Sequence, residues 1–196
     1  DQLKCAKLWT AYNFPPAEKP LWQGERYNHS RIRIGYLSSD FHQHATSYLM
    51  AGMFECHDKS RFETTAISCG PDDHSDIRRR LEAAFEHFID AADRNDHQIA
   101  ELIRSSEFDL LVDLKGYTRD SRPGILARRP APIQVNYLGF PGTMGAEYID
   151  YIVADRIVIL DGQNDCYAEH VVRLPNSYQA NDNQRSIADV AITRAE

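Results

Sequence analysis

The sequence has little that would support a disulfide framework, a membrane span or a nucleic-acid surface. Its four cysteines, Cys5, Cys56, Cys69 and Cys166, are widely scattered with no Cys-x-x-Cys pair, so we expect reduced, partly buried thiols. No apolar run approaches the roughly 18 residues of a membrane-spanning helix, and there is no signal-like start. The formal net charge of −7 argues against nucleic acid or an anionic membrane as a partner, because both need a basic surface. We therefore expect a cytoplasmic protein.

A dinucleotide motif and an extended basic patch are also missing. No Gly-x-Gly-x-x-Gly follows the first predicted strand, so the usual dinucleotide fingerprint is excluded. The one basic run is Arg78, Arg79 and Arg80, and we expect it to form a solvated helix face. What remains is a chain of 196 residues, 42% hydrophobic and 26% charged, which is ordinary for a globular domain with one full core.

Prolines separate an N-terminal appendage from the main domain. Residues 1–13 suit a short helix, which Phe14-Pro15-Pro16 ends. Residues 14–30 then form a connecting arm, so we predict helix and arm at 1–30 and one main lobe at 31–196. Because the sequence begins at Asp1 and ends in what looks like the middle of a helix or loop, we expect it to be a piece of a longer protein.

The main domain alternates strand patterns with helix patterns. Alternating apolar residues predict a first strand at Ile32, Ile34 and Tyr36. The alternation predicts an α/β fold, a Rossmann-like, doubly wound, mostly parallel sheet. The other expected strands are 62–69, 108–114, 132–138, 149–154 and 170–174, and the expected helices have apolar stripes at Leu49, Met53 and Cys56, at Ile77, Leu81, Ala84, Phe85 and Phe88, and after an N-cap near Asp96.

Three of the predicted strands end in loops that carry unusual polar chemistry. Ligands of open α/β sheets bind at the carboxyl ends of the strands, so we expect the three loops to surround one cleft. An acid, imidazoles and a hydroxyl follow the first strand, an arginine suited to carboxylate, phosphate or sugar hydroxyls follows the strand at 108–114, and glycines that expose backbone amides follow the strand at 132–138. The residues concerned are Asp40, His42, His44 and Thr46, then Gly116, Tyr117 and Arg122, then Leu138, Gly139, Gly142 and Gly145.

Other readings of these loops remain open at this point. Each loop taken singly could be structural. His42 and His44 could bind one metal ion as in a metal-dependent hydrolase, but such a site needs a third protein ligand, and no other loop offers an obvious one. The domain could also be a non-catalytic α/β interaction module that uses the cleft to hold a peptide.

Taken together, the three loops resemble the catalytic region of the O-linked N-acetylglucosamine transferases, a family that also contains the SPINDLY-type O-fucosyltransferases. The resemblance covers about residues 31–178 and rests on three blocks: Ser-Asp-Phe-x-x-His-x-Thr-Ser at 39–47, Gly-Tyr-Thr-x-x-x-Arg at 116–122, and Arg-Arg-Pro-Ala-Pro-Ile-Gln-x-x-x-Leu-Gly-Phe-Pro-Gly-Thr-x-Gly at 128–145. Members of this inverting family carry tetratricopeptide helices ahead of a two-lobed GT-B glycosyltransferase. The chain would then be the N-terminal lobe.

The resemblance implies roles for individual residues. His44 and Asp40 match the candidate catalytic residues, the histidine considered as a base or positioning group and the aspartate considered for proton removal. Thr46 matches the threonine near the sugar and diphosphate. The family usually has proline where this chain has Ala45, which leaves the backbone path of the loop open. The sugar pocket would be formed by Tyr117 and Arg122 together with the backbone of Leu138 and Gly139.

The implied activity is inverting transfer of a sugar from a nucleotide sugar to a Ser or Thr hydroxyl of a protein. UDP-GlcNAc is the expected donor, with GDP-fucose as the alternative, and neither a metal nor another cofactor is expected. In the family, a lysine and a helix N-terminus of the second lobe meet the diphosphate. That C-terminal nucleotide-binding lobe would follow this chain, so we expect the isolated chain to be inactive.

Overall fold

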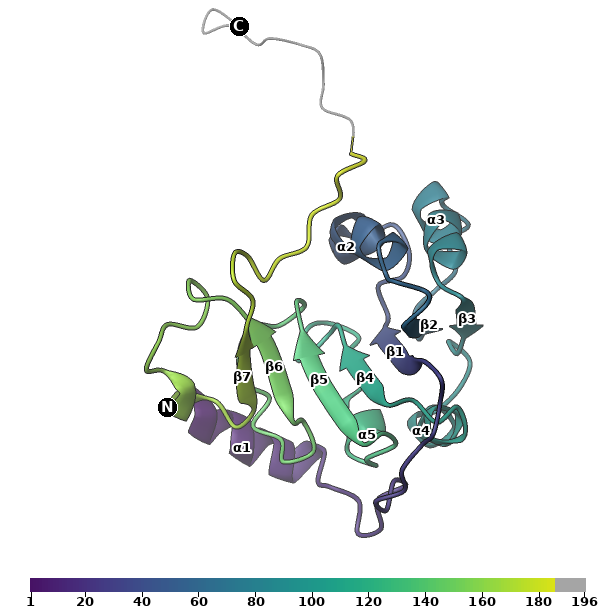
Figure 1. The fold of residues 1–196 in the computed structure, drawn as a ribbon. Coiled ribbons are helices and arrows are strands. Elements are labelled where there is room, and N and C mark those ends of the chain that lie inside the picture. The colour runs from purple at the N-terminus through teal and green to yellow at the C-terminus, as the bar shows by residue number, and fades with distance from the viewer. Residues whose placement is uncertain (186–196) are drawn as a thin grey trace, which may run out of the picture.

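The computed structural model describes residues 1–185 and contains one parallel sheet. Its seven strands lie in the order β3-β2-β1-β4-β5-β6-β7, and every neighbouring pair is parallel (Figure 1). The predicted Rossmann-like α/β fold is confirmed, although positions 186–196 of the predicted lobe lie outside the described residues. The strands are β1 (Ile32–Ser38), β2 (Phe62–Ser68), β3 (His87–Asp90), β4 (Leu110–Asp113), β5 (Ile133–Tyr137), β6 (Tyr151–Ala154) and β7 (His170–Arg173).

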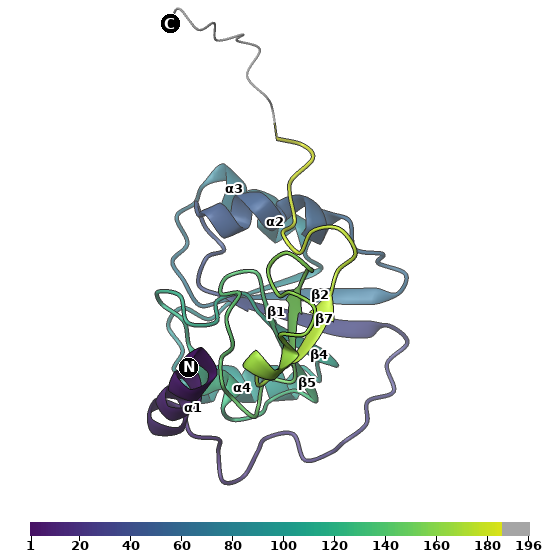
Figure 2. The same cartoon turned by 90° about the vertical axis from the view of Figure 1, so that its left-hand side faces the viewer.

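Helices pack on both faces of the sheet. Two of them, α2 (Ala45–Glu55) and α3 (Asp76–Ala84), lie on one face, and α4 (Asp96–Ser105), α5 (Pro123–Leu126) and α1 (Gln2–Asn13) lie on the other (Figures 1 and 2). A short 3-10 helix, η1 (Asn164–Cys166), precedes β7. β1 contributes to both cores, because Ile34 and Tyr36 pack beside α2 and α3 while Leu37 packs with α4. This alternation follows from the two-residue period of a strand.

The N-terminal helix and arm run along the α4 side of the sheet. The arm is tied to the segment after α5 by backbone hydrogen bonds, including Ala17 N to Ala127 O at 2.9 Å and Leu21 N to Arg128 O at 2.9 Å. Thr10 is the buried residue of α1, and its hydroxyl donates to Met144 O at 2.7 Å. The appendage therefore contacts the glycine-rich loop after β5.

The helix boundaries differ from the sequence prediction in two places. The N-cap of α4 is Asn95 rather than Asp96. The Asn95 side chain accepts from the Gln98 N–H, and the Gln98 side-chain oxygen accepts from the Asn95 N–H, which forms a capping box. The apolar stripe after the turn at 71–73 does not continue through Phe88. α3 ends at Ala84, and Phe88 lies in β3, paired with Ala66 of β2.

The buried face of α2 differs from the predicted apolar stripe. Its fully buried apolar side chains include Met50, Ala51 and Phe54, whereas Leu49 packs at the edge of this core and Cys56 is exposed. Both sets of residues have helical spacing, so periodicity alone could not choose between them. The cysteines are free, as expected, but Cys69 is the one that is partly buried, and Cys5, Cys56 and Cys166 are exposed.

The basic run is only partly solvated, which corrects the sequence prediction: Arg79 is exposed, Arg80 is half-buried and Arg78 is buried. Arg78 is 2% exposed and donates to Phe41 O at 3.1 Å and to the Ser68 hydroxyl at 3.0 Å. Its guanidinium also lies 4.3 Å from the centre of the Phe88 ring. Arg78 thus links α3 to the loop after β1, because its guanidinium has several N–H donors that reach different partners.

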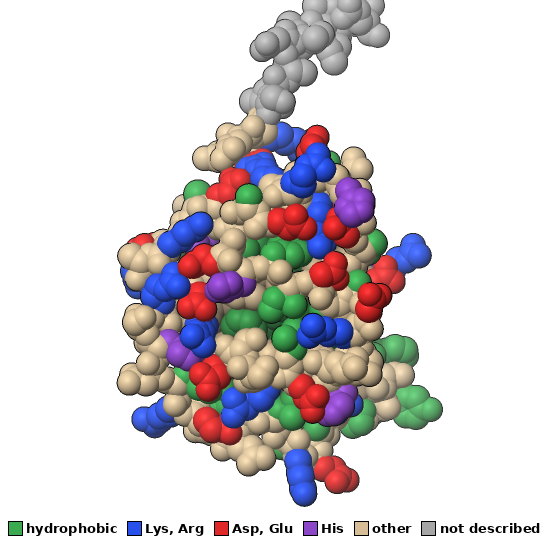
Figure 3. All heavy atoms as spheres, turned by 90° about the vertical axis from the view of Figure 1, so that its right-hand side faces the viewer, with side chains coloured by type: hydrophobic (Ala, Val, Ile, Leu, Met, Phe, Trp, Pro, Cys, Tyr) green, Lys and Arg blue, Asp and Glu red, His purple; other side chains and the backbone are tan. Residues whose placement is uncertain are grey.

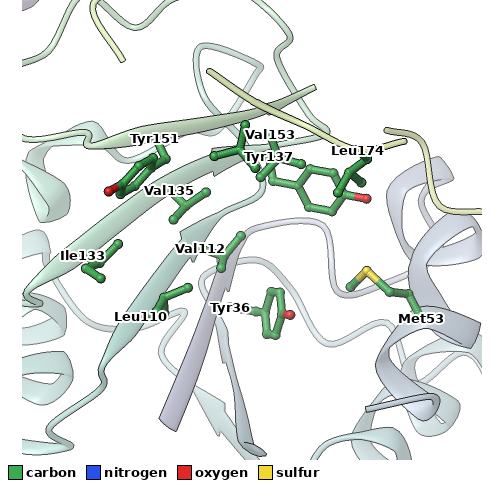
Figure 4. Close-up of a pocket in the computed structure, with 11 residues that line it drawn as sticks. Tyr36, Met53, Leu110, Val112, Ile133, Val135, Tyr137, Tyr151, Val153 and Leu174 are labelled. Carbon is green, nitrogen blue, oxygen red and sulfur yellow. The ribbon is translucent and has the colours of Figure 1, made fainter. Parts of the chain in front are cut away.

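The sheet face on the side of α2 and α3 is partly uncovered over β4 to β7. A groove of about 470 Å³ there is lined by apolar side chains such as Val112, Val135 and Val153 (Figure 4). None of the candidate site residues lines this groove. The groove therefore lies on the face of the sheet and reaches the carboxyl ends of the strands only at Tyr137 and Leu174.

The surface agrees with a mildly acidic composition. Acidic and basic side chains are interspersed on the face drawn in Figure 3, with no extended basic patch there.

Within residues 1–185, no helix has the length and hydropathy needed to cross a membrane.

Candidate active site

The three candidate loops leave the same edge of the sheet. β1 ends at Ser38, β4 at Asp113 and β5 at Tyr137, and these three strands are direct neighbours. Because all of them are parallel, their carboxyl ends lie side by side, which is where open α/β sheets bind ligands. His44 follows β1 and Gly139 follows β5, so both lie at one edge of the sheet rather than at opposite edges.

Asp40, two residues after β1, forms a buried ion pair with Lys115, two residues after β4. Lys115 Nζ lies 2.7 Å from Asp40 Oδ1 and 2.6 Å from Oδ2, and the two side chains are 6% and 10% exposed. A lysine that donates to both carboxylate oxygens stabilises the ionised carboxylate. Lys115 is not among the site residues predicted from the sequence. The available signal was its position two residues after a nearly continuous apolar strand.

Asp113 holds the turn that presents Lys115. Its carboxylate accepts from the backbone N–H of Lys115 at 3.1 Å and of Gly116 at 2.9 Å. Gly116 has φ +55°, a left-handed conformation that glycine adopts without strain. Complete burial raises the pKa of the Asp113 carboxyl to about 6, against the opposing effect of the two N–H donors.

His44 is the N-cap of α2. Its backbone is extended, and its Nδ1 accepts a hydrogen bond from the Thr46 backbone N–H at 3.2 Å. Asp40 Oδ2 lies 3.5 Å from the same nitrogen, and the His44 side chain is 43% exposed. Ala45 occupies the first helical position, which also accommodates proline readily, so the departure from the family sequence requires no change of backbone path.

The loop after β5 lies against the loop after β4. A Cβ added at Gly139 would come within 2.1 Å of Leu114 O, so only glycine allows this approach. The preceding residue, Leu138, has φ +66°, which is an unfavourable conformation for a bulky side chain. Such strain often occurs at functional turns, and here it places the backbone of residues 138 and 139 beside Lys115.

Tyr117 and Arg122 lie at the same edge, but their polar groups are bonded within the protein. The Tyr117 hydroxyl donates to Met144 O at 2.7 Å and contacts the Thr10 hydroxyl of α1. Burial raises the pKa of that phenol. Arg122 Nε donates to Asp96 Oδ1 at 2.7 Å. Lys115 thus contacts Asp40 directly and lies against Gly139, while His44 approaches Asp40 and Thr46 is bonded to His44. The catalytic and sugar-binding roles of all these residues remain predictions.

A metal site does not emerge from the described part of the chain. Residues 1–185 contain no group of three or more His, Cys, Asp or Glu side chains that could hold a metal ion. The rings of His42 and His44 lie 5.8 Å apart, tilted by 56°. The metal-dependent hydrolase alternative therefore gains no support from the geometry.

An open parallel sheet with an ion pair, an imidazole and close-packed glycine backbone at its carboxyl edge is the arrangement of a ligand-binding α/β lobe. Comparison with known proteins makes the class specific. The model for glycosyl transferase family 41 matches residues 11–194, and the chain belongs to that family.

Relatives and a solved structure agree with this assignment. A probable UDP-N-acetylglucosamine–peptide N-acetylglucosaminyltransferase SEC of Arabidopsis thaliana is 37% identical over 188 residues, which is 95% of this chain and 19% of the relative. The UDP-N-acetylglucosamine–peptide N-acetylglucosaminyltransferase of Caenorhabditis elegans is 35% identical over 172 residues, 86% of this chain and 15% of the relative. A mutant O-GlcNAc transferase of Thermobaculum terrenum superposes with a TM-score of 0.79 at 29% identity, covering 90% of this chain and 34% of that one. The chain thus spans about one fifth or less of the length of these two curated relatives.

Proposed function

We propose that this chain is one lobe of an inverting protein O-glycosyltransferase that moves GlcNAc from UDP-GlcNAc to Ser or Thr hydroxyls. The observation that carries the proposal is the convergence of Asp40, His44, Lys115 and Gly139 at one sheet edge in a chain of glycosyl transferase family 41. The relatives are named UDP-N-acetylglucosamine–peptide transferases, which supports this donor and this acceptor class.

The residue types suit the chemistry. Inverting transfer requires the acceptor hydroxyl to attack the anomeric carbon in line, to lose its proton, and to have the departing diphosphate stabilised. Backbone groups at Leu138 and at half-buried Gly139 can meet sugar hydroxyls, and His44 presents a half-exposed imidazole at the start of α2. No metal is required for these roles, because a nucleoside diphosphate is already a good leaving group.

The groups that would bind the diphosphate are expected in a second lobe. We propose that a C-terminal lobe and N-terminal tetratricopeptide helices of a longer, cytoplasmic protein complete the enzyme. The exposed apolar side chains of α1, Leu8 at 65%, Trp9 at 56% and Tyr12 at 87%, support helix packing on this side, since they are spaced along one helical face.

The test is a sugar-transfer assay on a longer protein that contains both lobes, with UDP-GlcNAc and GDP-fucose compared as donors and a Ser/Thr peptide as acceptor. Transfer of GlcNAc is the expected result, and transfer of fucose alone would move the assignment to the alternative donor. Substitution of His44 by alanine should lower transfer by about 100-fold or more, whereas His42→Ala should change it little. No transfer from either donor would refute the proposal.

A matched carboxylate variant separates the roles of the two candidate catalytic residues. If Asp40 removes the proton, Asp40→Asn should lower kcat strongly while His44→Ala has a mild effect. If His44 only positions the donor, its loss should raise KM and leave kcat nearly intact. Equal, small effects at Asp40, His44 and His42 would mean that the loop is structural.

A further inference from the structure

Two neighbours compete for one nitrogen of His44. The Thr46 N–H donates to Nδ1 at 3.2 Å, and this bond requires an unprotonated Nδ1. Asp40 Oδ2 lies 3.5 Å from the same nitrogen. This oxygen could accept a hydrogen bond from His44 only if Nδ1 carried a proton. A neutral imidazole carries one proton, so the two contacts imply opposite tautomers.

Lys115 decides between the two tautomers. Its ammonium donates to both oxygens of Asp40, at 2.7 and 2.6 Å, in a buried setting. The Asp40 carboxylate therefore has a close cation and needs no proton donor from His44. The longer 3.5 Å contact is beyond ordinary charge-assisted hydrogen-bond length, whereas the contact with Thr46 is the usual bond of an N-cap.

We propose that Lys115 is a positioning residue that fixes His44 as a hydrogen-bond donor. With Asp40 neutralised by Lys115 and Nδ1 occupied by the Thr46 N–H, neutral His44 carries its proton on Nε2. The exposed nitrogen then donates to an oxygen of the bound sugar, diphosphate or acceptor, and proton removal from the hydroxyl falls to another group. This inference rests on the proposed function only for the identity of the ligand.

The tautomer can be measured by NMR on this 196-residue chain without any transfer assay. The spectra are recorded in mildly basic solution, so that the imidazole with a single proton is observed. We expect His44 to show protonated Nε2 and a scalar coupling across the hydrogen bond from the Thr46 amide nitrogen to Nδ1. His44→Gln identifies the signals and His42→Gln should leave them unchanged. A proton on Nδ1, with no coupling to Thr46, would overturn the proposal.

The role of Lys115 is tested by a pair of variants in the same measurement. Lys115→Arg keeps the cation and should retain the coupling, whereas Lys115→Met leaves Asp40 without a partner and should transfer the His44 proton to Nδ1. A folded Lys115→Met protein with an unchanged His44 spectrum would show that Lys115 does not set the tautomer. If Lys115→Met does not fold, the tautomer of the unmodified chain and of Lys115→Arg still decides whether His44 is a donor.

Kinetics on the longer protein supply the second readout. A glutamine side chain can donate a hydrogen bond but cannot serve as a general base, so His44→Gln should retain transfer within about 10-fold while His44→Ala loses about 100-fold. Equal losses in the two variants would favour proton removal by His44 and overturn the donor role. Absence of transfer in the unmodified protein would instead refute the proposed function, while the NMR result would still decide the tautomer.

Discussion

Replacing Lys115 by methionine should destabilise the fold far more than replacing an exposed cation. Lys115 and Asp40 are 6% and 10% exposed and are joined by two short hydrogen bonds. The substitution keeps most of the apolar stem but leaves Asp40 as a buried carboxylate without its cation. Removing one partner of a buried ion pair costs about 3 to 5 kcal/mol.

The lower end of that range applies here, because Asp40 lies at the end of a strand, where water can approach after the change. A loss of about 3 kcal/mol in a chain of this size corresponds to a decrease in Tm of about 6 to 12 °C. The matched control is Arg79→Met, which removes an exposed partner of Asp76 and should cost less than about 1 kcal/mol.

The assay is a double-mutant cycle at Asp40 and Lys115. Urea-induced unfolding of the 196-residue chain and of each variant is monitored by fluorescence and circular dichroism. Asp40→Asn alone should also be costly, because it leaves the Lys115 ammonium buried. The double variant with Asp40→Asn and Lys115→Met contains no buried charge at these positions, so it should be about 3 kcal/mol more stable than the sum of the single effects predicts. Additivity within about 0.5 kcal/mol would show that the pair is not coupled and would refute the reasoning.

Further predictions concern stability, packing and ligand binding. Burial raises the pKa of Asp113 to about 6, so the folded chain binds more protons than the unfolded chain between about pH 4 and 6. The free energy of unfolding should therefore fall by up to about 3 kcal/mol as the pH rises from about 4 to 6. Urea titrations at the two ends of this window should show no such fall in Asp113→Asn. Gly139→Ala should lower stability by about 2 kcal/mol or more in the same assay, because its Cβ would lie 2.1 Å from Leu114 O; an unchanged midpoint would contradict the close approach. Asn95→Ala should cost about 1 kcal/mol through loss of the capping box, measured by thermal denaturation. Calorimetry should detect at most weak binding of UDP to the isolated chain, and micromolar affinity would contradict the proposed division into two lobes.

The order of strands and helices could be predicted from local pattern, because it depends on interactions over a few residues. Buried strands such as β4 show a nearly continuous apolar run, and parallel strands separated by helices have few possible topologies. β3 was the failure. Phe85 and Phe88 continue a helical spacing, and only pairing with β2 makes His87–Asp90 a strand.

The edge of the sheet that carries the site was likewise predictable, since the carboxyl ends of neighbouring parallel strands must meet. The loop sequences around Asp40, His44 and Gly139 were sufficient to select this edge and to suggest the family. The side chains that complete the site were harder to choose, because their partners lie far away in the sequence.

Only the tertiary structure decided which charges are paired. Lys115 contacts Asp40 across 75 positions of the chain, and Arg78 is buried against Phe41 O, although neither sequence neighbourhood distinguishes a buried cation from a solvated one. The sequence by itself determined the alternation of elements and the chemistry available at each strand end, through local spacing. The folded sheet determined the ion pair, the turn against Leu114 and the orientation of His44, because burial and electrostatic pairing depend on distances that exist only after the strands have come together.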